Sequence, residues 1–333
     1  MKIIFFLTLF CILVLGDILK VATYNVENLF DLKKNGHEYK EYIPYTYSQW
    51  NKKNYTIKLY NIAKVIKDID ADIIGLEEIE SLQALKDLRY TLKRKGLYYR
   101  YYAIANLKDT TVKVALLSKI PFLYKHEIAV QSSYKYRNIL EVKFKLKNGE
   151  NLYILVNHWK SKSGPESMRL VSAKALYKRV KELGYDKNII ALGDFNSHYE
   201  EYKSFKRKRR LNDTENITGI NHILGTINYQ DKAEKIHLKN GEFYNLWYDT
   251  KKNERYTHIY KKHKEALDSI LITKSLLNTK GILYLSHSIH TFKTSYLFKK
   301  NHIYRWQMTR RKKAKHKGKG YSDHLPLVAK FSY

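Results

Sequence analysis

The stretch Asn188-Ile189-Ile190-Ala191-Leu192-Gly193-Asp194-Phe195-Asn196-Ser197 places an acid and an amide two residues apart, just after an apolar run. The run is typical of a buried strand that ends at Gly193, so both polar side chains should emerge together at the strand's carboxyl end. Binding sites of α/β folds lie at that edge. A carboxylate beside a carboxamide can orient a water or hold a metal, while the amide donates to a phosphate oxygen. Gly-Asp with a nearby Asn is also ordinary turn chemistry, so this stretch needs support from elsewhere in the chain.

Two other predicted strands also end in polar side chains. The strand Ile18 to Tyr24 is followed by Asn25 and Glu27, which strand alternation places on the same side. The strand Ala71 to Leu76 is followed by Glu77-Glu78-Ile79-Glu80. Three carboxylates this close repel one another unless a cation intervenes, which suits a hard divalent ion such as Mg²⁺. Taken singly, each segment is equally typical of a solvated polar turn.

A fourth predicted strand, Leu152 to Val156, ends in Asn157-His158-Trp159-Lys160-Ser161-Lys162. This segment offers positive charge, hydrogen-bond donors and a group able to transfer a proton, which together suit a phosphate. Arg137 precedes another strand, expected over residues 139–146. A lone histidine would more often be structural, so the interpretation of this segment depends on the other motifs.

The remaining pattern predicts helices between these strands. Ser48 can cap a helix from about Gln49 to Ile69, Ser81 a helix to Lys95, and Pro165 fits the first turn of a helix to about Leu183. Further strands are expected over 97–102, 112–117 and 123–130, a hairpin over 255–260 and 266–272, and a closing strand over 322–331. Residues 17–333 are enough for one large α/β domain or two small ones, and no internal repeat or second domain is evident.

The first sixteen residues have the layout of a secretory signal. Lys2 precedes an apolar run from Ile3 to Leu15, and Gly16 is a small residue at the expected cleavage position. The run is shorter than the roughly 20 residues of a membrane-spanning helix, although a retained anchor is the alternative. Cys11 is the only cysteine and lies in this segment, so the mature chain should form no disulfide. We therefore predict a secreted or periplasmic protein without stable membrane insertion after cleavage.

The formal net charge of +30 predicts a polyanionic partner such as nucleic acid or an anionic membrane surface. Residues 301–320 contain many basic side chains and no acid, and we interpret them as a mobile basic loop able to grip a duplex backbone. The alternative is a disordered loop that only aids solubility. A bias toward Lys, Asn, Ile and Tyr in the coding sequence could also raise the charge.

Six motifs occur in the order in which the endonuclease/exonuclease/phosphatase superfamily carries them. They are Tyr-Asn-Val-Glu-Asn-Leu-Phe at 24–30, Ile-Gly-Leu-Glu-Glu-Ile at 74–79, Val-Asn-His-Trp-Lys-Ser-Lys at 156–162, Gly-Asp-Phe-Asn-Ser at 193–197, Leu-Asp-Ser-Ile-Leu at 267–271 and Ser-Asp-His-Leu-Pro-Leu at 322–327. The chain most closely resembles the secreted bacterial DNases of that superfamily. The resemblance implies a DNase I-like, four-layered α/β sandwich, with two packed mixed sheets flanked by helices.

The resemblance also implies a set of metal-binding residues. Glu78 corresponds to the principal ligand, Asn25 and Glu27 lie close by, and Asp323 serves the metal or the nucleophile. The implied ion is Mg²⁺ or Mn²⁺, and Ca²⁺ as a structural ion is also compatible. The superfamily usually has Gln-Glu where this chain has Glu77-Glu78, which leaves open which glutamate binds the ion.

The same resemblance implies the catalytic groups. His158 would contact the scissile phosphate, Asp194 and Asn196 would position water and stabilise the transition state, and Asp268 would hold His324 in the required tautomer. Whether Asp194 or His324 takes the proton of the water stays open, and so does the partner of His158. The expected substrate contacts come from three cations, namely Arg137, Lys160 and Lys162.

Together these features predict an exported, monomeric, metal-dependent nuclease with little sequence specificity, favouring DNA over RNA. The first alternative is a phosphatase or sphingomyelinase-like lipid phosphodiesterase on the same scaffold. The second is a non-catalytic nucleic-acid-binding protein, which would have lost at least one member of the implied catalytic set; all are present.

Overall fold

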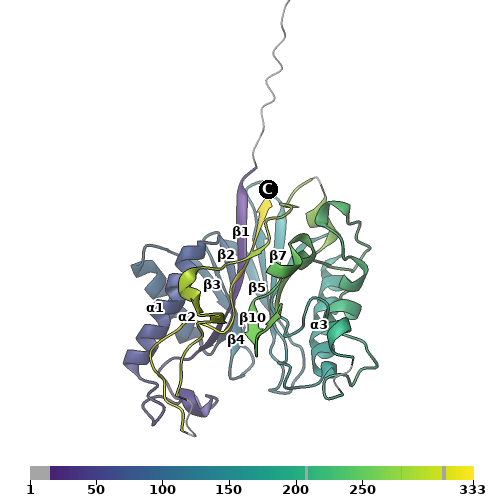
Figure 1. The fold of residues 1–333 in the computed structure, drawn as a ribbon. Helices are drawn as coiled ribbons and strands as arrows, with labels where there is room; N and C mark the ends of the chain where they lie inside the picture. Colours follow the sequence, from purple (N-terminus) through teal and green to yellow (C-terminus); the bar gives the residue numbers. More distant parts are fainter. Residues whose placement is uncertain (1–15, 207–208, 279, 310–312) are drawn as a thin grey trace, which may run out of the picture.

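The protein is built around two β-sheets that pack face to face (Figure 1). The computed structural model describes residues 16–206, 209–278, 280–309 and 313–333. Residues 1–15, and with them almost all of the expected signal and Cys11, lie outside the described residues. Among the residues described, no helix is both long and apolar enough to cross a lipid bilayer.

The first sheet has seven strands, in the order β13-β17-β1-β2-β4-β3 with β14 also pairing with β17. Its members are β1 (Ile18–Leu29), β2 (Ile73–Ile79), β3 (Tyr101–Ile104), β4 (Lys113–Ser118), β13 (Leu283–Tyr284), β14 (His290–Thr291) and β17 (Leu327–Ser332). Strands β1 and β2 run parallel, so their carboxyl ends lie at the same edge.

The second sheet has six strands, in the order β5-β6-β7-β8-β12-β9. They are β5 (Phe122–Ile128), β6 (Ile139–Lys145), β7 (Asn151–His158), β8 (Asn188–Asp194), β9 (Tyr244–Asn245) and β12 (Asp268–Ile272). Strands β7 and β8 are its parallel pair. The strand predicted to end at Gly193 is thus confirmed; it extends one residue further, to Asp194, and lies in the interior of the sheet.

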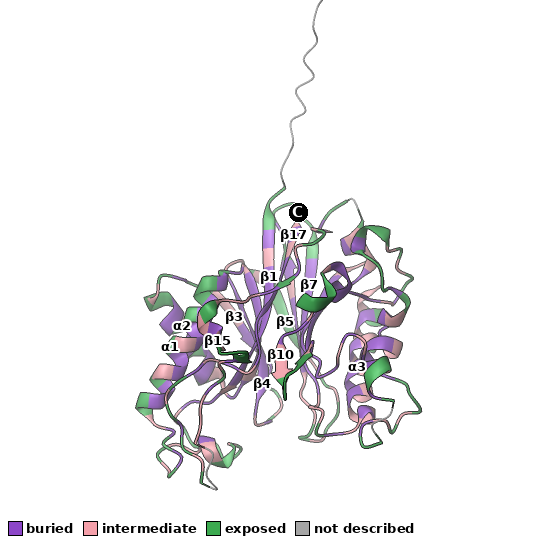
Figure 2. Cartoon of the chain, in the orientation of Figure 1, coloured by how far each residue is buried: buried purple, intermediate pink, exposed green. Residues whose placement is uncertain are grey.

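Apolar side chains from both sheets fill the space between them, and the central strands are buried along most of their length (Figure 2). Gly75 on β2 is needed for this close approach. A Cβ atom there would lie 2.4 Å from Cδ1 of Leu192 on β8. The two sheets are therefore in direct contact near the centre of the sandwich, which fixes one set of strand ends against the other.

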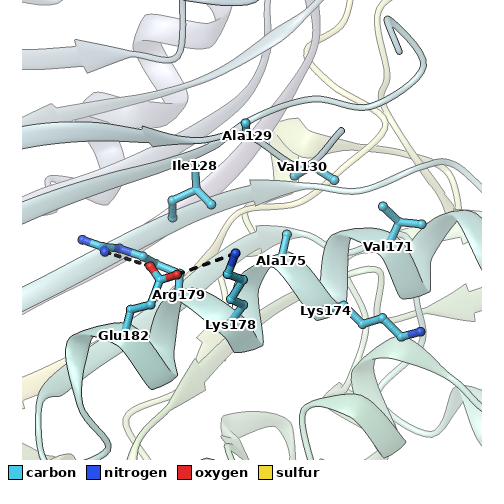
Figure 3. A pocket seen from close by; sticks show the side chains of 9 residues that line it. All are labelled: Ile128, Ala129, Val130, Val171, Lys174, Ala175, Lys178, Arg179 and Glu182. Carbon is cyan, nitrogen blue, oxygen red and sulfur yellow. Dashed lines mark hydrogen bonds and ion pairs between the residues drawn. The ribbon is translucent and has the colours of Figure 1, made fainter. Parts of the chain in front are cut away.

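Helix α3 (Glu166–Leu183) covers the outer face of the second sheet and buries a separate cluster that includes Leu155, Leu176 and Val180. A groove of about 410 Å³ runs between this helix and the end of β5 (Figure 3). Pro165 is the N-cap residue and not, as expected, part of the first turn.

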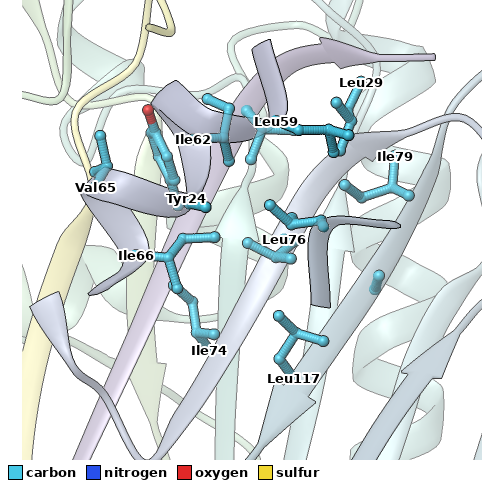
Figure 4. Packing of buried hydrophobic residues seen from close by; sticks show 14 of the residues in the cluster. Tyr24, Leu29, Leu59, Ile62, Val65, Ile66, Ile74, Leu76, Ile79 and Leu117 are labelled. Atoms are coloured by element: carbon cyan, nitrogen blue, oxygen red, sulfur yellow. The ribbon is translucent and has the colours of Figure 1, made fainter. Parts of the chain in front are cut away.

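Helices α1 (Lys52–Ile69) and α2 (Leu82–Arg94) form the fourth layer, on the outer face of the first sheet. The periodic apolar face of α1 meets β1 and β2 through side chains such as Ile62, Ile66 and Leu76 (Figure 4). Each such buried side chain contributes roughly 1.5–3 kcal/mol. The four-layered, DNase I-like sandwich is therefore confirmed.

The remaining elements are short. They are α4 (Glu201–Ser204), the 3-10 helices η1 (Lys40–Tyr42), η3 (Thr226–Asn228), η4 (Ala233–Lys235), η5 (Leu246–Asp249), η6 (Lys252–Glu254), η7 (Lys274–Leu277) and η8 (Ser295–Leu297), the π-helix η2 (Gly219–Ile223), and the two hairpins β10 (His258–Tyr260) with β11 (His263–Glu265) and β15 (Phe298–Lys299) with β16 (His302–Ile303).

Several expected boundaries are wrong for identifiable reasons. Helix α1 begins three residues later than predicted, because the side chain of Asn51, and not Ser48, accepts from the first turn at Asn54 N. The expected hairpin of 255–260 with 266–272 does not form. Residues 258–260 pair with 263–265, and β12 instead joins the second sheet beside β8.

The basic segment 301–320 is anchored where the structure describes it, which corrects the expectation of a mobile loop. Trp306 is 3% exposed and its indole N–H donates to His316 Nδ1 at 2.8 Å. The other ring nitrogen of His316 lies 2.8 Å from the carbonyl oxygen of Glu41. Two buried aromatic groups therefore fix this segment against the first sheet's helical layer.

Candidate active site

Polar side chains from both sheets converge where the parallel strands end. In the second sheet, His158 pairs in register with Asp194 across β7 and β8, and Asp268 on β12 lies opposite Asp194 on its other side. In the first sheet, Asn25 and Glu78 lie near the carboxyl ends of β1 and β2. Because the sheets touch, these two groups meet and form one cluster.

Asp194 is the centre of this cluster and is only 2% exposed. Its Oδ2 accepts from Asn25 Nδ2 at 3.1 Å and lies 3.6 Å from His158 Nε2 and 4.0 Å from His324 Nε2. Its Oδ1 accepts from the backbone N–H of Asn196 at 2.8 Å. Burial raises the pKa of Asp194 to about 7, although the charge of His324 opposes the shift.

Glu78, and not its neighbour Glu77, faces the cluster. The backbone of Glu78 is left-handed (φ 65°) at an irregularity in the pairing of β2, and its Oε1 accepts from Asn25 Nδ2 at 3.2 Å. Glu77 is buried and its Oε1 accepts from the hydroxyl of Thr23 at 2.7 Å. Burial, and then the charge of Asp268, raise the pKa of Glu77 well above its usual range. The local irregularity thus separates the roles of two adjacent acids.

His324 and Asp268 form a hydrogen-bonded pair. The distance from His324 Nδ1 to Asp268 Oδ2 is 2.7 Å, and the hydroxyl of Thr257 donates to the same carboxylate oxygen. Burial opposes a charged imidazole, yet the carboxylates of Asp268 and Asp194 raise the pKa of His324 well above its usual range. The pair therefore directs the second ring nitrogen of His324 toward Asp194 with a proton available for donation.

His158 has the opposite electrostatic character. It is 5% exposed, and burial, followed by the charge of Arg137, holds its pKa well below the usual range. Its Nε2 lies 3.6 Å from Asp194 and 3.8 Å from Glu78, while Nδ1 has no hydrogen-bond partner among the described residues. A neutral imidazole in this position can donate one hydrogen bond to a phosphoryl oxygen.

The three predicted substrate cations have different surroundings. The guanidinium of Arg137 donates to the carbonyl oxygen of Trp159 at 3.3 Å, and the side-chain amide of Asn196 donates to the same oxygen at 3.2 Å. Burial, and then the charge of Arg137, lower the pKa of Lys160, so these two cations lie on one side of the site. Lys162 instead pairs with the buried Glu201 at 2.8 Å, which leaves its charge compensated.

Arg305 is a site residue that the sequence did not single out. Its Nε donates to Glu27 Oε1 at 2.8 Å, and its Nη2 lies 3.1 Å from Asp323 Oδ2. The other oxygen of Glu27 accepts from the backbone N–H of Trp306 at 3.1 Å. The structure therefore brings Glu27 and Asp323, two of the predicted metal ligands, to a guanidinium. The one signal in the sequence was a run of basic residues, which does not show which of them turns inward.

We expect Arg305→Met to lower the free energy of unfolding by about 2 kcal/mol at about pH 8, because it leaves Glu27 charged and buried. Burial raises the pKa of Glu27 to about 7 even with Arg305 present. A carboxyl whose pKa is raised on folding destabilises the folded state as pH rises, so the loss should be smaller at about pH 5.5. Urea unfolding at both pH values measures it.

The matched control is the double variant Glu27→Gln with Arg305→Met, which removes both charges and should recover most of the lost stability. A loss for Arg305→Met that is equal at the two pH values, or that the double variant does not reduce, would contradict the proposed charge pairing.

The donor set suits a hard divalent cation. Glu78 and Asp194 approach the same amide nitrogen of Asn25, and neither forms an ion pair with Lys or Arg among the described residues. Asp194, Asp268 and His324 also offer ligand atoms within 4.8 Å of one another. Glu78 and Asp194 are the two carboxylates that could take such an ion, because Asp268 and His324 already bind each other. Burial, and then the charge of Asp323, raise the pKa of Glu78.

Comparison with known proteins agrees with this fold. A family model described as endonuclease/exonuclease/phosphatase family matches residues 20–332. A search of curated proteins finds no match. Solved structures with the same fold include D. rerio TDP2 in complex with a single-strand DNA product (14% identity, TM-score 0.59, covering 95% of this chain and 99% of that one). Another is a mannosyl-6-phosphatase of Bacteroides thetaiotaomicron (15% identity, TM-score 0.57, covering 95% and 100%).

Proposed function

Because this chain belongs to the endonuclease/exonuclease/phosphatase family, whose members are metal-dependent hydrolases of phosphoester bonds, we propose that it is an exported nuclease that cleaves DNA with little sequence specificity. The observation that carries the proposal is the convergence on Asp194 of Asn25, His158 and His324 from two different sheets. The chain acts as a monomer, and the apolar run from Ile3 to Leu15 directs its export.

In the proposed reaction, a water attacks phosphorus while the bond to the leaving oxygen breaks, and that oxygen takes a proton from solvent and departs as the alcohol. Asp194 takes the proton of the water, because its carboxylate lies at the centre of the cluster and is oriented by the N–H of Asn196. His324, held by Asp268 through Nδ1, directs its other ring nitrogen at the reacting group and stabilises the added negative charge. This assigns the base that the sequence left open.

The remaining groups bind and orient the phosphate. Neutral His158 donates a hydrogen bond to one phosphoryl oxygen, and Arg137 and Lys160 offset its charge from the side. Glu78 and Asp194 would hold Mg²⁺ or Mn²⁺, which when bound supplies positive charge against the phosphoryl oxygens, and Asn25, whose Oδ1 accepts from the backbone N–H of Glu27, orients both carboxylates through Nδ2. The oxygen-rich donor set favours these hard ions over softer metals.

A phosphatase is the second candidate, because the mannosyl-6-phosphatase shares this fold along nearly the whole of both chains. The formal net charge of +30 favours a long polyanion over a small phosphomonoester. Comparing hydrolysis of DNA with hydrolysis of a sugar phosphate separates the two.

The direct test is cleavage of closed circular plasmid DNA by residues 17–333. We expect cleavage with Mg²⁺, none with EDTA, and a loss of at least about 10²-fold in His158→Ala. His126→Ala is the matched control, because His126 is exposed on β5, and it should cleave at the wild-type rate. A folded wild-type protein that leaves DNA intact but hydrolyses a sugar phosphate would reject the nuclease and favour the phosphatase.

A further inference from the structure

Two hairpins stand beside the active site and border one cavity. Strands β10 and β11 are joined by Lys261 and Lys262, and strands β15 and β16 by Lys300 and Asn301. The cavity between them has a volume of about 460 Å³ and is lined by residues of both hairpins together with Asp323. The cavity therefore adjoins Asp323, the residue that precedes His324 of the active site.

The turns of these hairpins hold lysines where turn geometry favours other residues. Lys261, Lys262 and Lys300 all have left-handed backbones, with φ of 45°, 71° and 56°. A two-residue turn with positive φ at both positions strongly prefers Asn-Gly, and one with positive φ at its first position only prefers Gly there, because these residues accept this conformation with least strain. A residue type that is unfavourable for its backbone is expected where function requires its side chain.

The lysine side chains are also free to bind a ligand. Lys261, Lys262, Lys299 and Lys300 are exposed, and within the described ranges none of the four forms an ion pair with an acidic side chain. In contrast, the nearby Lys293 pairs with Glu254. The exposed surface of these hairpins is visible in Figure 2 around β10 and β15. The cavity rim is therefore a concentration of uncompensated positive charge.

Aromatic rings accompany this charge. Tyr260, which precedes the first turn, is 56% exposed, and the ammonium of Lys299 lies 5.6 Å from the ring centre of Tyr304. Exposed rings interleaved with cations are typical of surfaces that bind a nucleic-acid strand, since the rings stack on bases and the cations meet phosphates. A sulfated or carboxylated polymer offers the charge but no bases.

The hairpins are positioned to hold a strand that continues out of the active site. His258 at the start of β10 pairs with His324, and their ring centres are 5.1 Å apart. We propose that the two hairpins form a clamp for a nucleic-acid strand, binding phosphates beyond the one being cleaved. This inference rests on the proposed nuclease function. Binding of phosphates beyond the cleaved one would make the protein select long strands over short ones.

The test replaces each turn by the sequence that its backbone prefers. The clamp variant combines Lys261→Asn, Lys262→Gly and Lys300→Gly, which removes three positive charges and places residues that accept positive φ in both turns. Binding of a fluorescent single-stranded oligonucleotide of about 20 nucleotides is followed by anisotropy in EDTA, so that no cleavage occurs. We expect the Kd to rise about tenfold, and the logarithmic salt dependence to become shallower by about 2, since each single-strand phosphate contact contributes roughly 0.7.

A matched control removes charge elsewhere. Lys174→Asn with Lys178→Asn takes two exposed lysines from the α3 groove of Figure 3, which shares no lining residue with the clamp, and should leave the Kd within about twofold. The clamp variant should also unfold at the same or a higher temperature than the wild type, because Asn-Gly suits the first turn and Gly suits position 300 of the second. Lower oligonucleotide affinity at undiminished thermal stability is the result that a merely structural role cannot produce.

Three outcomes would overturn the clamp. The first is an unchanged Kd in the clamp variant, and the second is an equal change of the Kd in the α3 control. The third is that dextran sulfate competes for the protein as well as DNA of equal charge does, and that this competition is the same in Tyr260→Ala. The test is independent of catalysis. A wild-type protein that binds the oligonucleotide in EDTA but cleaves no DNA with Mg²⁺ would reject the nuclease and leave the clamp standing. Cleavage of DNA by the wild type, together with an unchanged Kd in the clamp variant, would support the nuclease and reject the clamp.

Discussion

Replacing Asp194 by Asn should lower kcat for DNA cleavage by about 10³ to 10⁴-fold without unfolding the protein. The amide has the same shape and can still accept from the N–H of Asn196, so the local backbone should be retained. It cannot take a proton from water, and it contributes no negative charge opposite His324. Loss of activity with an intact fold is therefore the expected result.

Stability should change in the opposite direction. Burial raises the pKa of Asp194 to about 7, so its charged form is unfavourable in the metal-free protein above that pH. The neutral amide removes this cost, and we expect Asp194→Asn to unfold at the same or a higher urea concentration at about pH 8. In saturating Mg²⁺ the comparison should reverse, because only the wild type gains its full affinity for the ion.

Asp186→Asn is the control for this substitution, since its side chain is 73% exposed in the turn before β8. It should leave both cleavage and stability close to wild type. An Asp194→Asn protein that retains more than about a tenth of the wild-type kcat would show that another group accepts the proton, with His324 the next candidate.

The second large effect is structural: Gly193→Ala should lower the free energy of unfolding by about 3 kcal/mol or more. Gly193 has φ +129°, and a Cβ atom there would lie 2.0 Å from the carbonyl oxygen of Asn157 on the adjacent strand. Both are backbone constraints, so no side chain can move to relieve the clash. The register pair that follows is His158 with Asp194, so activity should be lost as well.

Gly149→Ala separates the effect of the positive φ from the effect of the clash at Cβ. Gly149 also has a positive φ, of +86°, but nothing lies within 4 Å of the Cβ position. It should cost only the backbone strain, about 1 kcal/mol, and leave cleavage intact. Urea unfolding of the two variants in parallel measures the difference, and equal losses would show that the close approach of β7 and β8 contributes nothing.

The order of apolar runs and polar ends was enough to predict most of the site. Asn25, Glu78, His158 and Asp194 all follow buried strands, and carboxyl ends of parallel strands necessarily share an edge. Strand alternation could not choose between Glu77 and Glu78. The choice depends on an irregularity in the pairing of β2 that turns the side chain of Glu78, and not that of Glu77, toward the cluster around Asp194. Strand alternation alone assigns faces only while the pairing stays regular.

Contacts between segments that are distant in the chain could not be predicted from the sequence. Arg305 reaches Glu27 across almost the whole chain, and nothing in a basic segment distinguishes the one residue that folds inward. The same limit applies to Trp306 and His316, whose mutual hydrogen bond anchors a segment that composition alone describes as mobile. The hairpin of β15 and β16 was missed, and β10 was given the wrong partner strand, because these strands are only two or three residues long.

The division of the site between two sheets has a consequence for how activity arises. Asn25, Glu78 and His324 come with the first sheet, and His158, Asp194 and Asp268 with the second, so the hydrogen bonds from Asn25 to Asp194 and from His324 to Asp268 both cross between them. A chain that has folded only one half holds no complete catalytic group. Strand β1 pairs with β2 on one side and with β17, the last strand of the chain, on the other, so the site that contains His324 is completed only when the C-terminal segment joins the first sheet.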